Sequence, residues 1–273
     1  MIETAYRYDP ACRRFIETDA LAAPTIIDSW LAVDGRVRAI GRHFDRFSSS
    51  IDGYVNREHV QGFLDCVAAE IPREGAWFPR IEYAETSGLA LRLRPAPNRD
   101  REAVLWDAPQ TDPRHTPHAK GPDLAALTRV RARAHQAGAH EAVIIGRDGV
   151  VCETTFATLM WWEDDVLCGP DWTEPVLPSV TRALVETIAR NRGIDVDYRP
   201  RSWEHVRYRP MWLLNALHGV RAVSAIAGGQ AVVPVPQTSA TLLESFRRDL
   251  DTYAEPAAQY RATGTHDQCD PQT

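Results

Sequence analysis

Residues 120–153 read KGPDLAALTRVRARAHQAGAHEAVIIGRDGVVCE, and the pattern within this stretch decides which fold the chain can adopt. Asp123 is a typical N-terminal cap for the helix that follows. The buried stripe of that helix has the spacing of one helical face and consists of Leu124, Leu127, Val130, Ala134 and Ala137. Residues 142–145 then form an apolar strand, which Asp148-Gly149 turns into a second strand ending at Glu153. The stretch therefore predicts a helix beside a strand hairpin.

The segments on either side continue this mixture of helices and strands. Downstream, the pattern predicts strands 159–162, 166–168, 212–214 and 220–226, a helix that opens within 177–181 and stops at Gly193, and a last helix over 240–253. Upstream, it predicts strands 26–33 and 36–40 around Asp34-Gly35, helices 42–54 and 58–70, and strands 77–83, 89–93 and 103–106. The predicted fold class is therefore α+β, grading into α/β.

A proline-rich stretch, 108–122, divides the chain and marks a candidate linker. We therefore expect a small α+β domain over residues 1–112 and a larger domain over 113–255. Residues 256–273 are polar and are predicted to form a disordered tail.

Composition excludes several classes of protein. The chain has 273 residues, 44% of them hydrophobic, and a formal net charge of -6, which disfavours binding to nucleic acid by phosphate neutralisation. No apolar window is long enough to cross a bilayer, and the N-terminal residues lack an apolar signal core. These features predict a cytoplasmic protein without nucleic-acid or membrane partners.

Lys120 is the only lysine among 31 basic lysine and arginine residues. Arginine is always protonated and cannot act as a nucleophile, whereas an amine can do so when burial or a nearby cation lowers its pKa. A lysine that persists in so arginine-rich a chain therefore favours imine chemistry at this position. The alternative is a surface lysine without a function.

Three further features are candidates for a ligand site. The helix start at Ser179, Val180 and Thr181 offers free N–H groups to a phosphate, as any helix start does. Glu153 ends a buried strand, so its carboxylate needs a protonated heterocyclic nitrogen or an arginine as partner. Arg92 and Arg94 share one face of their strand and can bind a substrate carboxylate or face solvent.

A metal site is the weaker alternative. Asp112, His115 and His118 are close together in the sequence, but the prolines between them prevent the helical spacing that a two-histidine site uses. We expect no metal.

The order of these motifs resembles that of the class IV (fold type IV) aminotransferases, which use pyridoxal 5'-phosphate. The motifs are HFDRF at 43–47, KGPDL at 120–124, DGVVCE at 148–153, LPSVTR at 177–182 and NALHG at 215–219, and the likeness covers roughly residues 25–230. The family includes branched-chain and D-amino-acid aminotransferases and aminodeoxychorismate lyase. The resemblance implies a homodimer in which the second domain binds the cofactor and has a mixed, β-barrel-like sheet.

The resemblance also implies a role for each matching residue. Lys120 would hold the cofactor as an internal aldimine and move the proton, and Glu153 would pair with the pyridine nitrogen. Arg46, Val180 and Thr181 would bind the cofactor phosphate. Asn215, Ala216 and Leu217 match a loop that binds phosphate or the substrate carboxylate.

Three functions follow from this resemblance. The first is transfer of an amino group between an amino donor and a keto acid, and the second is β-elimination that gives 4-aminobenzoate and pyruvate. The third is a degenerate relative that only binds a phosphorylated ligand. The family usually has Gly in place of Ser179, Asn in place of Thr158 and a tyrosine near Leu124, whereas NAL at 215–217 is similar to the lyase loop.

Overall fold

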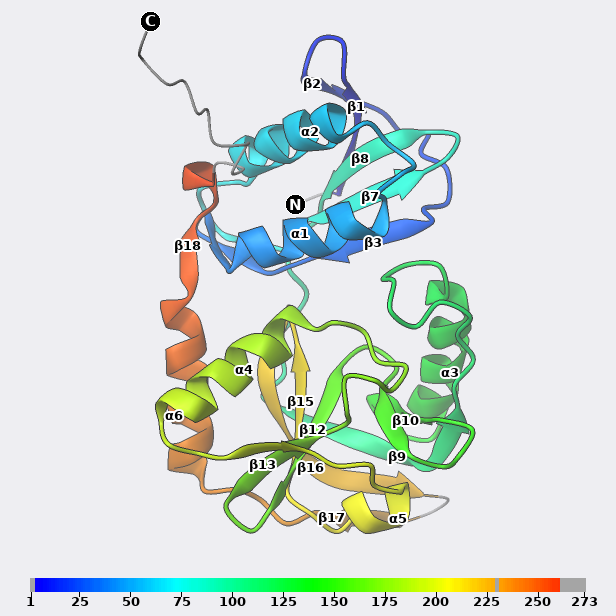
Figure 1. Cartoon of the computed structure of the whole chain (residues 1–273), viewed down its shortest axis with the longest axis vertical. Helices are drawn as coiled ribbons and strands as arrows, with labels where there is room; N and C mark the ends of the chain where they lie inside the picture. The colour runs from blue at the N-terminus through cyan, green and yellow to red at the C-terminus, as the bar shows by residue number, and fades with distance from the viewer. Residues whose placement is uncertain (1–2, 229–230, 261–273) are drawn as a thin grey trace, which may run out of the picture.

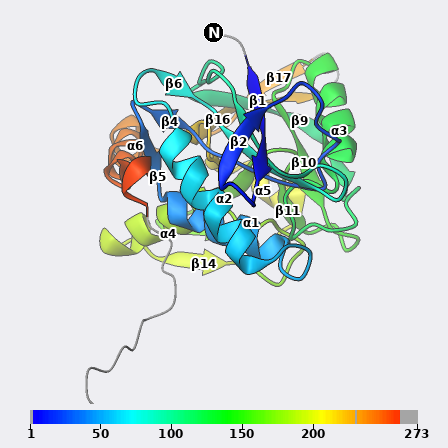
Figure 2. The ribbon, with the colours of Figure 1, turned by 90° about the horizontal axis from the view of Figure 1, so that it is seen from above.

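The computed structural model describes residues 3–228 and 231–260, which form two α+β parts stacked on each other (Figure 1). The smaller part contains β1 (Thr4–Asp9), β2 (Arg14–Glu17), β3 (Ile26–Ser29), β4 (Ala32–Val33), β5 (Arg36–Arg38), α1 (Ile40–Ser50), α2 (Arg57–Glu70), β6 (Ala76–Trp77), β7 (Arg80–Ala84) and β8 (Gly88–Leu93). Five of its strands form an antiparallel sheet in the order β2-β1-β8-β7-β3. Helices α1 and α2 lie on this part, as the view from above also shows (Figure 2).

Aromatic residues fill the core of the smaller part. Trp30, Phe44, Phe47 and Phe63 are all at most 1% exposed, and they come from the segment between β3 and β4 and from the inner faces of α1 and α2. The predicted turn at Asp34-Gly35 joins β4 to β5, and both of its residues have the positive φ that a tight hairpin turn requires.

The larger part is built on one mixed sheet that curls into half a barrel. It contains β9 (Glu102–Thr111), α3 (Leu124–Gln136), β10 (Glu141–Ile145), β11 (Val151–Thr154), β12 (Thr158–Glu163), β13 (Val166–Gly169), α4 (Val180–Asn191), β14 (Val196–Tyr198), α5 (Trp203–Val206), β15 (Met211–Asn215), β16 (Gly219–Gly228), β17 (Ala231–Pro234) and α6 (Ala240–Thr252). The strand order is β11-β10-β9-β16-β15-β12-β13-β14, with β17 paired to β16. Figure 1 shows α3 on one side of this part and α4 and α6 on the other.

The structure differs from the sequence prediction at residues 26–33, which form two strands in two different sheets instead of one strand. The predicted strand 26–33 breaks at Trp30, so that β3 joins the five-stranded sheet and β4 joins a small sheet with β5, β6 and β18 (Ala254–Pro256). Periodicity does not reveal this break, because residues 26–32 are all buried and none signals a turn.

The proline-rich stretch is not a linker in the structure. Strand β9 extends to Thr111 and pairs in parallel with β10 and β16, so a division after residue 112 would separate β9 from its own sheet. Near the C-terminus, β18 returns to pair with β5 of the smaller part, and residues 257–259 form a 3₁₀ turn. The predicted disordered tail otherwise falls on residues 261–273, which lie outside the described residues.

Several elements escaped the sequence prediction, namely β1, β2, β14, α5, β17 and β18. Strands β2 and β17 were missed because they consist almost entirely of exposed residues and have no alternation of apolar and polar residues. Within the described part of the chain, no helix combines the length and apolar character that a membrane span requires.

Candidate active site

A cavity of about 350 Å³ lies where the two parts meet, and the predicted lysine projects into it. Its walls come from β3 and α1 of the smaller part and from the loop before α3, the start of α4 and the β15–β16 turn of the larger part. The basic side chains in its lining are Arg46, Arg80, Arg94, Arg114, Lys120 and Arg131, and the acidic ones are Asp123, Glu141 and Glu153. The cavity is therefore suited to anionic ligands.

The backbone around Lys120 is fixed against β3. The Lys120 carbonyl accepts a hydrogen bond of 2.8 Å from the Ile27 N–H. Gly121 has a φ of 132°, and a Cβ there would lie 2.6 Å from the Thr25 oxygen, so only glycine allows this approach. The lysine is thus part of the cavity wall and not a stray surface residue.

The environment of Lys120 favours a neutral amine. Burial and the nearby Arg46 lower the pKa of its ammonium group, and the attraction of Asp28 and Glu153 offsets only part of that effect. A neutral amine is the form that attacks a carbonyl carbon.

Arg46 is held by a buried carboxylate, Asp28, which is fully enclosed. The Arg46 Nε and Nη2 atoms donate to Asp28 at 2.8 Å each, and Nη1 donates to the Pro178 carbonyl at 2.8 Å. His43 Nδ1 lies 2.9 Å from the same carboxylate. Burial by itself raises the pKa of Asp28, but Arg46 and His43 outweigh it and hold that pKa well below its usual range.

The sequence prediction missed Asp28 and His43. A single carboxylate inside the otherwise apolar run 26–31 was the available signal, because a buried charge needs a partner. The spacing of His43 and Arg46 places both on one face of α1, toward that carboxylate.

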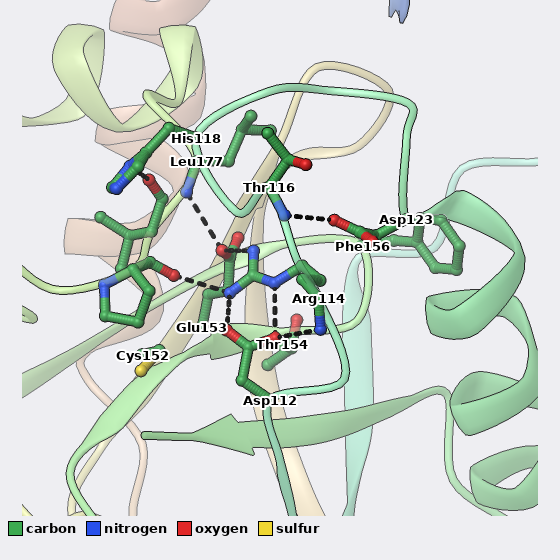
Figure 3. Close-up of polar contacts among 12 residues, drawn as sticks. Asp112, Arg114, Thr116, His118, Asp123, Cys152, Glu153, Thr154, Phe156 and Leu177 are labelled. Carbon is green, nitrogen blue, oxygen red and sulfur yellow. Dashed lines mark hydrogen bonds and ion pairs between the residues drawn. The ribbon is translucent and has the colours of Figure 1, made fainter. Parts of the chain in front are cut away.

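Glu153 is 6% exposed. Of the two kinds of partner that the sequence allowed for its carboxylate, an arginine is present in the structure (Figure 3). Arg114 Nη1 forms a short ion pair with Glu153 Oε1, which also accepts a hydrogen bond of 3.1 Å from the Leu177 N–H. The second oxygen, Oε2, has no hydrogen-bond partner among residues 3–228 and 231–260. Burial raises the pKa of Glu153, and Arg114 limits the rise.

Arg114 is itself fixed from two further sides. Asp112 accepts from its Nε at 2.8 Å and from its Nη2 at 2.7 Å, and the Pro175 carbonyl accepts from Nη2 at 2.6 Å. Asp112 is therefore a partner of Arg114, and His118 Nδ1 lies 3.1 Å from the Val176 carbonyl. Among the described residues, no three acidic, histidine or cysteine side chains are arranged to hold a metal.

The four residues 175–178 organise much of this site. Their backbone groups contact Arg114, His118, Glu153 and Arg46 in turn, at Pro175, Val176, Leu177 and Pro178. The segment leads directly into α4, where the Ser179 hydroxyl accepts from the Arg182 N–H at 3.2 Å. This cap uses the third helical N–H, and the N–H groups of Val180 and Thr181 have no hydrogen-bond partner within the described chain.

The β15–β16 turn forms the opposite wall. Asn215 braces it, since its amide nitrogen donates to the Phe156 carbonyl at 3.3 Å and its Oδ1 accepts from the His218 N–H at 2.8 Å. The Ala216 carbonyl accepts from the Leu31 N–H at 3.3 Å. Asn215, Ala216 and Leu217 all line the cavity, as the sequence predicted for a binding loop.

Only one of the two predicted substrate arginines reaches the cavity. Arg92 pairs with Glu82 and Glu3 and does not line the cavity. Arg94 lines it, with its Nε donating to the Phe78 carbonyl at 3.1 Å. Arg94 has no acidic partner within 4.0 Å in the described chain, and burial, with help from Arg80, lowers its pKa to about 10.

Comparison with known proteins identifies the group to which this site belongs. A family model described as amino-transferase class IV matches residues 25–226. Comparison of the sequence with curated proteins gave no match.

Solved structures give a consistent picture. A hypothetical aminotransferase from Mycobacterium tuberculosis, in a form with α-ketoglutarate and pyridoxamine phosphate, has a TM-score of 0.73 at 16% identity over 92% of this chain and 98% of that chain. A fold IV transaminase from Curtobacterium pusillum has a TM-score of 0.71 at 17% identity over 91% and 99%. A branched-chain aminotransferase mutant from Thermobaculum terrenum has a TM-score of 0.72 at 16% identity over 94% and 98%. These likenesses confirm the predicted fold.

The Arg114–Glu153 pair yields a stability prediction. In Arg114→Met, a buried carboxylate loses its cation, so we expect the free energy of unfolding at about pH 8 to fall by roughly 3–5 kcal/mol. The variant further raises the folded-state pKa of Glu153, so protonation relieves the defect as the pH falls, and the loss is smaller at about pH 5. Urea denaturation at both pH values measures this. As a control, Arg57→Met removes a 90% exposed arginine and costs less than about 1 kcal/mol. Equal losses in the two variants would contradict the prediction.

For Lys120 we predict that substitution raises the free energy of unfolding instead of lowering it. In Lys120→Met, the desolvated amine and its repulsion from Arg46 are removed, so we expect the cofactor-free protein to be more stable than wild type by about 1 kcal/mol at neutral pH. The penalty in wild type is present below the lowered folded pKa and disappears as the pH rises through the unfolded value of about 10.4. The gain measured by thermal unfolding should therefore be smaller at about pH 10 than at neutral pH. A loss of stability at neutral pH would refute this account.

Proposed function

Because the chain belongs to the class IV aminotransferase family, we propose that it transfers an amino group between an amino acid and a keto acid with pyridoxal 5'-phosphate as cofactor. The observation that carries the proposal is the position of the only lysine. Lys120 lies in a cavity that also contains the enclosed carboxylate Glu153 and the start of α4 with Arg46 beside it. An imine, a ring nitrogen and a phosphate each find a matching group there.

The residues present fit this cofactor at three points. The N–H groups of Val180 and Thr181, together with Arg46, form an anion site at a helix start. Glu153 keeps Oε2 available for a protonated ring nitrogen. Lys120 supplies the amine. Structures of the Mycobacterium tuberculosis aminotransferase with pyridoxal phosphate and with pyridoxamine phosphate support the assignment by likeness of fold.

When bound, the cofactor acts as an electron sink for the carbanion formed at the α-carbon of the donor. The chain's own groups then have distinct tasks. Lys120 Nζ takes and returns the α-proton, a role that its lowered pKa favours. Glu153 holds a proton at the ring nitrogen, and Arg114 limits how far the pKa of that carboxyl rises. Arg46 keeps the phosphate end fixed because Asp28 and Pro178 hold its guanidinium.

Substrate carboxylates are proposed to bind at Arg94 and at the turn of Asn215, Ala216 and Leu217. Arg46, Arg80, Arg114 and Arg131 each have an acidic partner, which leaves Arg94 as the arginine of the lining without one within the described chain. Arg94 can therefore form a charge-assisted pair with an incoming carboxylate without first breaking an ion pair. Its partners in this proposal are an amino donor and a keto-acid acceptor.

Three further expectations remain part of this proposal. The protein is expected to be cytoplasmic, as its composition predicts, and a homodimer, as the family resemblance implies. The similarity of 215–217 to the loop of aminodeoxychorismate lyase favours β-elimination as the second candidate function. In that case Lys120 would still move the α-proton, and pyruvate would leave without a keto acceptor.

The test of the proposed function exploits the single lysine. Incubation with pyridoxal phosphate should produce the visible absorbance of a lysine-bound cofactor, and borohydride should fix one cofactor on Lys120, as peptide mapping by mass spectrometry would show. Lys120→Arg keeps the charge but cannot form an imine, so it should lose both signals and all turnover. As a matched control, Arg129→Lys on the exposed side of α3 provides a second lysine that should stay unmodified.

The outcome separates the three candidate functions. Loss of the visible absorbance on addition of an amino donor, with recovery on addition of a keto acid, supports transamination. Pyruvate release from aminodeoxychorismate without a keto acid supports the lyase. Failure of wild type to retain pyridoxal phosphate would overturn the proposal, and bound cofactor that reacts with no donor would point to a degenerate relative.

Arg94 gives a prediction on substrate affinity. In Arg94→Gln we expect the KM for the keto acid to rise by about 10- to 100-fold, because a charge-assisted bond to a carboxylate is lost. The kcat should change less than KM. Steady-state kinetics with Arg7→Gln as control, an exposed arginine in the same sheet, isolates the effect of position from that of net charge. An unchanged KM in Arg94→Gln would remove this residue from the substrate site.

A further inference from the structure

One face of α3 turns from apolar to cationic along the cavity. Leu124, Leu127 and Arg131 line the cavity from this helix, and their spacing of three and four residues places them on one face. Arg131 lies about 10 Å along the helix axis from Leu124, which itself follows Lys120 closely in the chain. A ligand that reacts at Lys120 and extends along this face meets two leucines before it meets a guanidinium.

At the cationic end of this face, Arg131 and Arg221 share a single ion-pair partner among the described residues, and Asp100 lies near enough to raise the pKa values of Arg221 and His218. Glu141 is fully buried, and its Oε1 lies 3.3 Å from Arg131 Nη2 and 3.6 Å from Arg221 Nη2. Its Oε2 is already occupied by the Thr155 hydroxyl and the Phe156 N–H. One carboxylate thus serves two arginines.

Arg221 is a buried guanidinium that is incompletely hydrogen-bonded. It is 1% exposed, and its Nε and Nη2 atoms have no hydrogen-bond partner in the described chain. A buried guanidinium without full pairing destabilises the protein unless another anion or water compensates it. Arg131 meanwhile stacks over the Phe156 ring at 5.1 Å, which fixes its guanidinium beside the cavity.

His218 adds a neutral donor at the same end. The Asp100 N–H donates to its Nδ1 at 3.1 Å, so in the neutral ring the proton resides on Nε2. Burial and the nearby Arg221 lower the pKa of His218 to about 4, so the ring stays neutral at physiological pH. His218 lines the cavity and can donate to a ligand without competing for a proton.

We propose that this end of the cavity is a second carboxylate subsite, in which Arg131 and His218 bind the distal carboxylate of a substrate whose spacer packs against Leu124 and Leu127. This inference rests on the proposed function, because it assumes that the substrate reacts at Lys120. It assigns the substrate class as amino or keto acids that carry a second carboxylate beyond an apolar spacer of several atoms. Arg221 acts behind the subsite, where its charge strengthens anion binding.

Unreactive acids test the subsite directly. Pimelate and heptanoate have spacers of the same length, and only pimelate carries the second carboxylate. Isothermal titration calorimetry on the cofactor-loaded protein should show tighter binding of pimelate, and Arg131→Gln should reduce the preference for pimelate over heptanoate by about 10- to 100-fold. Arg129→Gln, an exposed arginine on the same helix, should keep the wild-type preference. His218→Phe, which removes the neutral donor, should reduce the preference by a smaller factor.

The readout distinguishes this inference from the proposed function. A wild-type protein that binds pyridoxal phosphate but shows no preference for pimelate, or an Arg131→Gln variant that keeps the full preference, would overturn the subsite and leave the aminotransferase proposal intact. If the protein fails to bind the cofactor, the same titration on the cofactor-free chain still decides whether Arg131 binds a carboxylate. Circular dichroism of each variant checks that it is folded.

Discussion

The ion pair between Asp28 and Arg46 is the interaction on which the site depends. Asp28 belongs to β3 of the smaller part, and Arg46 extends from α1 to the Pro178 carbonyl at the start of α4 in the larger part. A guanidinium at the junction of two parts would be expensive to bury alone. The carboxylate makes the burial tolerable, and the remaining N–H groups of the guanidinium can then serve a ligand. One buried acid therefore joins the two parts and creates a fixed cation between them.

Other arginines around the cavity are also held by ion pairs with carboxylates. Arg114 is held by Asp112 and Glu153, and Arg80 is held by Glu82. Each pairing keeps a cation rigid in a region where the low dielectric strengthens every interaction with a ligand. The carbonyls and N–H of 175–178 complete the pairing without adding charge. A site assembled in this way is organised before the ligand arrives, so binding need not order the side chains.

The sequence predicted the site residues whose role follows from their own chemistry. It did not predict the residues whose role depends on which segments the fold brings together. Lys120 was recognisable because its chemistry is unavailable to arginine, and Glu153 because a buried carboxylate needs a partner. Arg114 was not recognisable, because nothing in the proline-rich stretch 108–122 indicates that it folds back onto β11. The division of 26–33 between two sheets was hidden for a similar reason, since both halves are buried. Arg92 and Arg94 share a strand face by period, but the sequence does not show that Glu82 and Glu3 pair with Arg92 and that Arg94 is the one that lines the cavity.

Two of the three departures from the family pattern, at Ser179 and Thr158, are compatible with an intact phosphate site. Ser179 caps α4 through its own hydroxyl and engages the third helical N–H, at Arg182. The first two N–H groups, those of Val180 and Thr181, point from the helix start and are the ones that a phosphate needs. Glycine in place of Ser179 would leave all three N–H groups open but would lose the cap, which is worth only a few tenths of a kcal/mol in this comparison. Thr158 begins β12, pairs with Leu214 and lines the cavity without leaving its strand. The geometry at these two positions therefore gives no support to a degenerate binding role.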